Sequence, residues 1–566
     1  MKPKKVKIND SLSYNELTSP QKNKYFLYEN IFHIILSIFL VLYFTLRLAF
    51  KCYSLAEKYN FKLEGLTEGY SFLGGHRDFS DHQWRYFRQN LSLLLLFAII
   101  FCTISKIIKN YIKNIELLKI FYLIMGFSFA FLLHRIKIIY LLIVLYISFS
   151  LCKYYSVFGK KIFISFTWIF CIIIKVTSEI YRGYYINFIN WPNALKDSLL
   201  DWQTGFGIIM LKMISFNVEF SHIYDNEKKN NYIENVTAIK EHCPSCSKGK
   251  FCLKALKFVN ADISDFNFIN YLVYIFYPPF YLAGPNVMYH SFIFQLNNIN
   301  ENKHNEFFDS NKLFYILRTL FIFIVFEVFN HFIYVNALLT NKYNKQILKE
   351  NPLSYFDLFF LAFNDLVFLW LKFSLIWKIA RLWGWIDGIY AEENMNRCIY
   401  NNYCFEGFWR AWHRSYNVWL IRYIYIPLGG KNKKLLNTFV VFSFVALWHD
   451  LRWHLLVWGW FIYVFIVPEI VVKSYFAREE LKYLNYCIWF RYLRAAFSSL
   501  YVILMIIANL IGFGIGNEEV VDVLYQLFKR CKFINFIIQI LFFMPMVIVM
   551  YYLRYLEEQK GKAKNY

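Results

Sequence analysis

Long runs of apolar residues, separated by shorter polar segments, follow one another along most of the chain. The hydrocarbon core of a bilayer is about 30 Å thick, and about 20 apolar helical residues cross it. The pattern therefore predicts an all-α polytopic membrane protein with about ten to twelve passes. The candidate segments are Ile31–Leu48, Leu91–Ile104, Leu118–Leu133, Ile136–Cys152, Ile162–Val176, Gly205–Phe216, Phe268–Met288, Leu313–Leu339, Tyr355–Ile379, Asn437–Trp448, Leu455–Val472, Ala495–Gly514 and Ile534–Leu553.

Two of these segments do not fit a simple spanning helix. Phe268–Met288 is interrupted by Pro278, Pro279 and Pro285, and Asn437–Trp448 is too short to cross a bilayer. Broken helices at membrane depth are tolerated where the freed backbone is buried in protein. We therefore expect both segments to be re-entrant or broken helices.

The polar segments divide the chain without marking a second domain. Residues 1–30 form a polar, basic N-terminal tail, and residues 31–566 are expected to form a single transmembrane domain. Within that domain, residues 222–257 form a polar loop and residues 297–312 an Asn-rich insertion. The residues with chemical potential gather in a core region, 381–469.

The composition supports the membrane prediction and explains the charge. Hydrophobic residues make up 58% of the 566 residues, and mean hydropathy is +0.34. The net charge of +23, from 62 Lys+Arg against 39 Asp+Glu, comes from short basic clusters between apolar runs. Such clusters are typical of membrane flanks rather than of a nucleic-acid surface. Because both ends of the chain are basic, the positive-inside rule predicts that both lie in the cytosol.

One small cysteine cluster raises the question of a metal. His242 and Cys243, with Cys246 and Cys252, have ligand types and partly the spacing of a zinc site. Free thiols, or a disulfide in a luminal loop, remain the alternatives. Adjacent ligands at 242 and 243 give poor tetrahedral geometry and a second CxxC pair is missing, so no metal site is predicted.

Ionisable residues inside apolar runs are candidates for function. Glu327 and His331 are one helical turn apart and share a face, and Asp365 lies in a second apolar run. For these three residues an interhelical hydrogen-bonded role is the favoured interpretation.

His413 and His449 differ from the other candidates because tryptophans surround them. Twelve of the 16 tryptophans lie between Trp370 and Trp489. A tryptophan belt at the membrane interface would explain the cluster, but it does not require two histidines. A neutral histidine at the buried end of an apolar helix could accept a proton from a hydroxyl group. The residues alone leave a structural and a catalytic role open.

Several motifs resemble the membrane-bound O-acyltransferase (MBOAT) family, in particular its glycerol uptake protein branch, which is related to the Hedgehog acyltransferases. The combination of WHRSYN, IPLGG and ALWHD is specific to this resemblance, which runs from about residue 77 to the C-terminus. The similar stretches are Arg77–Leu91, Tyr277–Pro285, Arg381–Cys398, Trp412–Gly430 and Phe442–Trp460.

The resemblance implies a helical bundle around a central tunnel that moves a fatty acyl group from acyl-CoA to a hydroxyl. No bound cofactor is expected, and acyl-CoA is the co-substrate. The most similar branch is associated with lyso-lipid acceptors in GPI-anchor remodelling at the endoplasmic reticulum membrane. Membrane lipids are therefore the expected partners, and nucleic acid is not.

The family's near-invariant histidine matches His449, which is expected to be the general base. The second motif position matches His413, expected to position substrate or to stabilise charge on the thioester oxygen. Four neighbours are assigned to substrate binding: Arg414, Asn417, Trp448 and Asp450.

Two other functions remain open at the level of the sequence. A protein acyltransferase of the Hedgehog type would differ only in its acceptor. A glycerol or proton transporter would use the histidines as relays, but transporters often show paired broken helices in two repeats. One Pro-broken segment without a counterpart weighs against that function.

Overall fold

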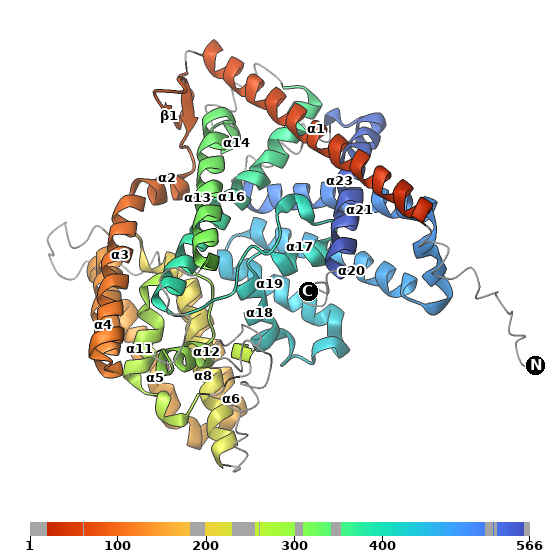
Figure 1. Ribbon diagram of the computed structural model, residues 1–566. Coiled ribbons are helices and arrows are strands. Elements are labelled where there is room, and N and C mark those ends of the chain that lie inside the picture. Colours follow the sequence, from red (N-terminus) through yellow and green to blue (C-terminus); the bar gives the residue numbers. More distant parts are fainter. Residues whose placement is uncertain are drawn as a thin grey trace, which may run out of the picture.

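The computed structural model describes residues 20–59, 61–181, 198–228, 255–257, 259, 261–299, 310–340, 353–514, 525 and 529–559. These residues form helices joined by short connections, with one small hairpin (Figure 1). The helices are α1 Pro20–Lys58, α2 His82–Gln89, α3 Leu91–Ile107, α4 Ile115–His134, α5 Ile138–Ser150, α6 Tyr155–Ile180, α8 Trp202–Lys228, α11 Phe268–Phe276, α12 Tyr289–Asn297, α13 Ser310–Phe332, α14 Val335–Thr340, α16 Tyr355–Asp387, α17 Phe405–Ala411, α18 Arg414–Leu420, α19 Lys434–His449, α20 Trp453–Phe476, α21 Ile488–Asn509 and α23 Phe533–Gln559. The hairpin pairs β1 Leu66–Glu68 antiparallel with β2 His76–Asp78.

The all-α membrane fold is confirmed. In the described part of the chain, nine helical stretches are long and apolar enough to cross a membrane. One of these stretches, Ile115–Ile180, contains α4, α5 and α6. Helix α5 alone has 13 residues, too few to cross a bilayer, so the predicted ten to twelve passes stay a prediction. The first helix, α1, begins at Pro20, inside the segment assigned to the polar tail.

Burial separates the outer helices from the central ones. Only 17% of the most apolar window of α1 is buried, against 83% for α16. Most apolar side chains in that window of α1 therefore face outward, as expected for contact with lipid, and Figure 1 shows this helix along an outer edge of the molecule. Helix α16 runs through the interior and carries side chains toward the core region 381–469.

The structure corrects the length of one predicted segment. The candidate segment Gly205–Phe216 covers only part of the helix, because α8 has 27 residues. Polar residues such as Lys212 and Glu219 lower its mean hydropathy to 1.2, yet 78% of its most apolar window is buried. A helix surrounded by protein can carry polar groups that a lipid-facing helix cannot.

The proline-broken segment has the predicted form. Helix α11 ends at Phe276, a 3₁₀ turn follows at Pro278–Phe280, and the chain resumes as α12. The break exposes carbonyl groups at the end of α11, and Nζ of Lys212 donates to those of Tyr274 and Ile275, at 3.1 and 3.0 Å. The freed backbone is thus satisfied inside the protein.

The C-terminal end of α16 is fixed by a buried polar cluster. Asp387 accepts hydrogen bonds from Nζ of Lys109 at 2.7 Å, from the hydroxyls of Tyr122 and Tyr277 at 2.6 and 2.5 Å, and from Ser105 at 2.5 Å. The Lys109 and Asp387 side chains are 6% and 0% exposed. These contacts fasten α16 to α3, α4 and the turn after α11.

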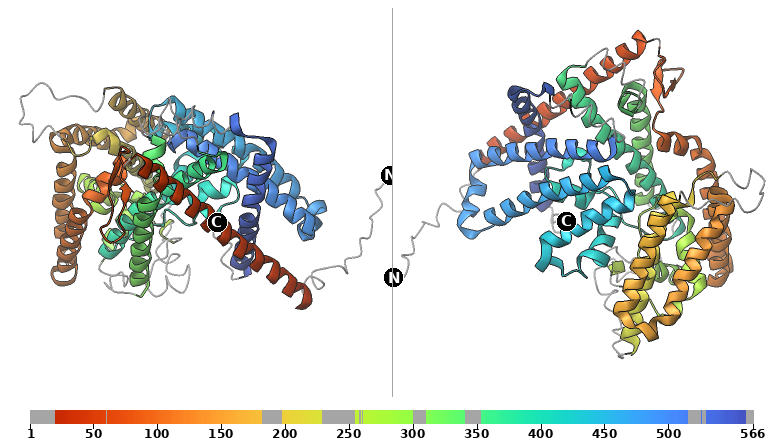
Figure 2. Two further views of the ribbon diagram at one scale, coloured as in Figure 1. Left: turned by 90° about the horizontal axis from the view of Figure 1, so that it is seen from above. Right: turned by 180° about the vertical axis from the view of Figure 1, so that it is seen from behind.

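Close packing also sets the position of α19, which has 16 residues and is too short to span a bilayer. A Cβ atom on Gly459 of α20 would lie 2.8 Å from the carbonyl oxygen of Phe442. Glycine at this position therefore allows the two helices to approach closely. Figure 2 shows α19, α20 and α21 side by side, as their contacts require.

Candidate active site

His413 lies at a strained point of the backbone. It caps the N-terminus of α18 with φ 45° and ψ 52°, a left-handed conformation that non-glycine residues seldom adopt. The turn is held in place because the backbone N–H of Arg414 donates to the carbonyl of Asn394, at 3.1 Å. Strained residues of this kind persist where surrounding contacts fix them, and they are concentrated at functional sites.

The imidazole of His413 is stacked on a tryptophan of α16. The ring centroids of His413 and Trp377 are 4.4 Å apart, with an interplanar angle of 21°. Tyr416 contacts the same imidazole at 5.1 Å. Burial in these aromatic surroundings, with a smaller contribution from charge on His449, lowers the pKa of His413 to about 3. His413 is therefore neutral at physiological pH.

His449 is the last residue of α19 and lies against Phe513, Trp448 and Trp458, with ring centroids 5.2, 4.8 and 6.1 Å away. Its side chain is accessible at the end of α19, while burial among the aromatic rings lowers the pKa of the imidazole to about 4. Only four residues of α19 are buried, since the helix packs against α20 along one face. An open position lets a substrate reach the imidazole.

Trp448 connects the two histidines. Its ring centroid lies 4.8 Å from that of His449 and 6.2 Å from that of His413. Tyr416 stacks on it at 4.4 Å, and its Nε1 donates to the carbonyl of Gly207 at 2.9 Å. The structure thus brings together two histidines that are 36 positions apart in the sequence.

The ring nitrogens of both histidines are available for chemistry. No described residue makes a hydrogen bond to the imidazole of His413 or His449. A neutral imidazole can accept a proton at one nitrogen and donate from the other. Two such rings around one indole can serve as a proton acceptor and a hydrogen-bond donor to a substrate held between them.

The other three predicted substrate-binding residues make contacts within the protein. Nε of Arg414 lies 3.3 Å from Glu392, and the side-chain amide of Asn417 donates to the carbonyl of Trp409 at 3.0 Å. Asp450 forms an ion pair with Arg452 at 2.7 Å. Their roles toward substrate stay predictions.

The ionisable residues of the other apolar runs lie in different surroundings. The carboxylate of Glu327 accepts hydrogen bonds from Nε of Arg88, at 2.8 Å, and from the hydroxyl of Tyr70. These two contacts join α13 to α2 and to the hairpin region. His331 also contacts Tyr70, with ring centroids 6.1 Å apart. Asp365 is buried, about 18 Å along α16 from Trp377 at 1.5 Å per residue.

Sequence reasoning missed two features of this region. Trp377 was not linked to His413, because nothing in the sequence shows a stack across 36 positions. Glu219 and His290 were also missed, although both are buried and Nδ1 of His290 lies 2.8 Å from Oε1 of Glu219. The one available signal was an acidic residue inside the apolar stretch Met213–Phe220.

A metal centre receives no support from the described residues. Within the described ranges, no three His, Cys, Asp or Glu residues are grouped in a way that could hold a metal ion. The cysteine cluster formed by Cys243, Cys246 and Cys252 lies outside these ranges.

The fold is that of a polytopic helical membrane protein, and two histidines without hydrogen-bond partners among the described residues lie against one tryptophan. The family model of the membrane-bound O-acyltransferase family matches residues 188–511, more than half of the chain. The chain belongs to the membrane-bound O-acyltransferase family and is an O-acyltransferase enzyme.

Curated relatives agree with this assignment. The chain is 34% identical over 477 residues to membrane-bound O-acyltransferase GUP1 of Candida tropicalis, covering 84% of this chain and 78% of that protein. It is 32% identical over 567 residues to membrane-bound O-acyltransferase gup1 of Schizosaccharomyces pombe, covering 96% and 91%. A shorter match, 30% over 184 residues, links it to the protein-cysteine N-palmitoyltransferase HHAT of Mus musculus, covering 31% and 35%.

Proposed function

We propose that the protein transfers a fatty acyl group from acyl-CoA directly to the hydroxyl group of a lyso-lipid, most specifically in the remodelling of GPI anchors. The observation that carries this proposal is that the imidazoles of His413 and His449 both lie against the ring of Trp448, without a hydrogen-bond partner among the described residues. Such a pair provides a proton acceptor and a hydrogen-bond donor without a metal or a covalent enzyme intermediate.

In the proposed reaction, His449 accepts the proton of the acceptor hydroxyl. The oxygen attacks the thioester carbonyl carbon, and a tetrahedral intermediate forms with negative charge on the former carbonyl oxygen. His413, neutral because its pKa is about 3, donates a hydrogen bond to that oxygen. When the C–S bond breaks, the CoA sulfur receives the proton from His449, and the ester product leaves.

The geometry around each histidine suits its role. His413 is rigid, because it is stacked on Trp377 and fixed at the start of α18, and preorganised donors stabilise developing charge best. His449 is exposed, so a lipid hydroxyl can approach it from outside the bundle.

The first test is acyl transfer by the purified protein in lipid nanodiscs, with labelled palmitoyl-CoA and lyso-phosphatidylinositol. We expect His449→Ala to lower the turnover number by about 10²–10⁴-fold, the usual contribution of a general base. The matched control is His454→Ala, which removes a histidine five positions later. Unchanged turnover in His449→Ala would remove the assignment.

The second test identifies the acceptor in cells depleted of the protein and rescued with the wild type or with His449→Ala. Accumulation of lyso-GPI anchors in the depleted and His449→Ala cells supports the proposal. Unchanged anchors together with one unacylated protein would show a protein acceptor. Unchanged lipids and proteins with lost glycerol uptake would show a transporter.

We also propose that the protein lies in the endoplasmic reticulum membrane with both termini in the cytosol. The support is the clusters of lysines at residues 2–7 and 560–564. Glycosylation tags added at each end test the orientation, because only a luminal tag is modified. Modification of either tag would contradict it.

A further inference from the structure

A pocket with a largely apolar lining and a few polar side chains lies between α12 and α18. His413 caps the N-terminus of α18, and Ser415 of the same helix lines the pocket. The pocket is lined by Leu256, Lys257, Asn286, Val287, Met288, His290, Ser291, Tyr390, Ala391, Glu392, Ser415 and Val418. Neither the reaction proposed above nor the predicted binding residues account for its interior.

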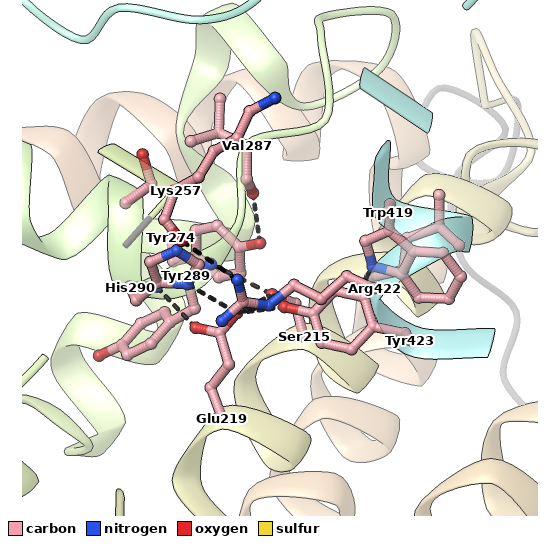
Figure 3. A network of polar contacts seen from close by, with 12 residues as sticks. Ser215, Glu219, Lys257, Tyr274, Val287, Tyr289, His290, Trp419, Arg422 and Tyr423 are labelled. Atoms are coloured by element: carbon pink, nitrogen blue, oxygen red, sulfur yellow. Dashed lines mark hydrogen bonds and ion pairs between the residues drawn. The ribbon is translucent and has the colours of Figure 1, made fainter. Parts of the chain in front are cut away.

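His290 is one of the lining residues, and Figure 3 shows it beside Glu219 of α8. Nδ1 of His290 lies 2.8 Å from Oε1 of Glu219, at an angle outside regular hydrogen-bond geometry. The backbone N–H of His290 donates to Oε2 of Glu219 at 2.7 Å. The carboxylate also accepts hydrogen bonds from the hydroxyls of Tyr423 and Ser215. A carboxylate beside Nδ1 favours the tautomer with its proton there, which leaves Nε2 as an acceptor.

The acceptor on His290 has no partner within the described ranges. The side chain is 4% exposed, and Nε2 receives no hydrogen bond. Asn286, in the same lining, has both its amide nitrogen and its amide oxygen buried without a described partner. Buried polar atoms are nearly always paired in folded proteins. Three unpaired atoms in one pocket therefore point to a ligand that supplies the missing partners.

The charges around the pocket favour an uncharged ligand. At its rim, Nζ of Lys257 lies 2.6 Å from Glu392, and Nε of Arg414 lies 3.3 Å from the same carboxylate. Nε of Arg422 lies 4.0 Å from Oε1 of Glu219, so both carboxylates near the pocket already have cationic neighbours. The unpaired interior atoms are neutral groups that match hydroxyl or amide functions.

We propose that this pocket binds an uncharged, hydroxyl- or amide-bearing portion of a substrate, with Nε2 of His290 accepting a hydrogen bond and the Asn286 amide donating one and accepting another. The proposal rests on the acyl-transfer function proposed above. Two substrates carry such chemistry: the pantetheine arm of an acyl-CoA and the polyol head of a lipid acceptor.

Binding to the purified full-length protein in nanodiscs, followed by saturation-transfer NMR, tests the pocket without turnover. The probes are pantetheine, myo-inositol and inorganic phosphate. We expect saturable binding of pantetheine or myo-inositol, weakened at least tenfold by His290→Phe and by Asn286→Leu. Two variants are used because Asn286→Leu keeps side-chain size and removes only the amide atoms. His222→Phe, a histidine near the end of α8 that contacts Lys160, is the matched control and should bind normally.

The outcomes distinguish the acyl donor from the lipid acceptor as the ligand of the pocket. They also distinguish failure of the pocket proposal from failure of the proposed acyl-transfer function. Binding of pantetheine alone assigns the pocket to the donor, and binding of myo-inositol alone assigns it to the acceptor. Binding of phosphate only, no binding, or unchanged binding in both pocket variants would overturn the proposal. His449→Ala should bind the probes like the wild type. Absence of acyl transfer by a wild-type protein that still binds a probe would refute the proposed function, while the pocket would stand.

Discussion

The protein places polar groups among its helices in two contrasting ways. Around Asp387, every carboxylate oxygen is used by donors from α3, α4 and the turn after α11, and the cluster is fully buried. Around Trp448, two imidazoles have no hydrogen-bond partner among the described residues, one is strained and the other exposed. A polar group inside a membrane protein is therefore not functional by its position alone. The difference lies in whether its hydrogen bonds are satisfied.

The largest effect on stability is expected at the satisfied cluster. Asp387→Ala leaves Lys109 buried without its counter-charge, so it should lower the free energy of unfolding by about 3–5 kcal/mol. Asp387→Asn keeps one acceptor oxygen, so it should lower the free energy of unfolding by less than Asp387→Ala does. Thermal unfolding in detergent measures both, and a stable Asp387→Ala protein would contradict a structural role for the cluster.

At the unsatisfied pair, His413→Asn is expected to reduce turnover about 100-fold, which corresponds to about 2.7 kcal/mol in the activation free energy. Because burial lowers the pKa of His413 to about 3, the residue stays neutral between pH 5 and pH 8. Burial also lowers the pKa of His449, to about 4, so both imidazoles are neutral in this range and any loss of activity from protonation of either one falls below pH 5.

The pH dependence of turnover checks this assignment. The acidic limb of the profile should be unchanged in His413→Asn relative to the wild type. A shift of that limb would identify His413 as the titrating base and reverse the two roles.

A smaller effect is expected where the helix pair that carries His449 is closely packed. Gly459→Val would place side-chain atoms against the carbonyl oxygen of Phe442 and force α20 away from α19. This overpacking should lower the free energy of unfolding by about 1–3 kcal/mol. Stability and turnover should fall together, because His449 moves with α19. Gly205→Ala is the control, since its nearest contact is 3.4 Å and alanine favours a helix. Equal stability of both variants would rule out the close approach.

The smallest effect is expected at the tryptophan between the histidines. Trp448→Phe removes the hydrogen bond from Nε1 to Gly207, which is worth about 1 kcal/mol, but keeps an aromatic ring. Turnover should fall about tenfold at most, on the scale of that single bond. Trp489→Phe, at a position 60% exposed, is the control. A complete loss of activity would mean that Trp448 itself contacts the reacting groups.

The sequence predicted those parts of the fold that depend on local composition. Apolar runs gave the spanning helices, and Pro278 and Pro279 gave the break between α11 and α12. Helix α8 was placed too short because its buried face carries Lys212 and Glu219, whose partners come from distant segments. Local hydropathy cannot register a polar group that is satisfied by another helix.

The residues of the candidate site could be predicted from the sequence, but their positions relative to one another could not. His413, His449 and the surrounding tryptophans were found from their concentration in one region. The left-handed backbone of His413 and its stack on Trp377 arise from tertiary contacts, which a single sequence does not encode locally. The accessibility of His449 could not be predicted for the same reason, since it depends on which face of α19 meets α20.

The most direct test of the account is the turnover number per folded molecule of His449→Ala, with the unfolding temperature measured on the same sample. The account predicts a fall of about 10²–10⁴-fold in turnover with the unfolding temperature of the wild type. A variant that keeps its turnover, or that loses it only in proportion to unfolded protein, would show that His449 is a structural residue like those around Asp387.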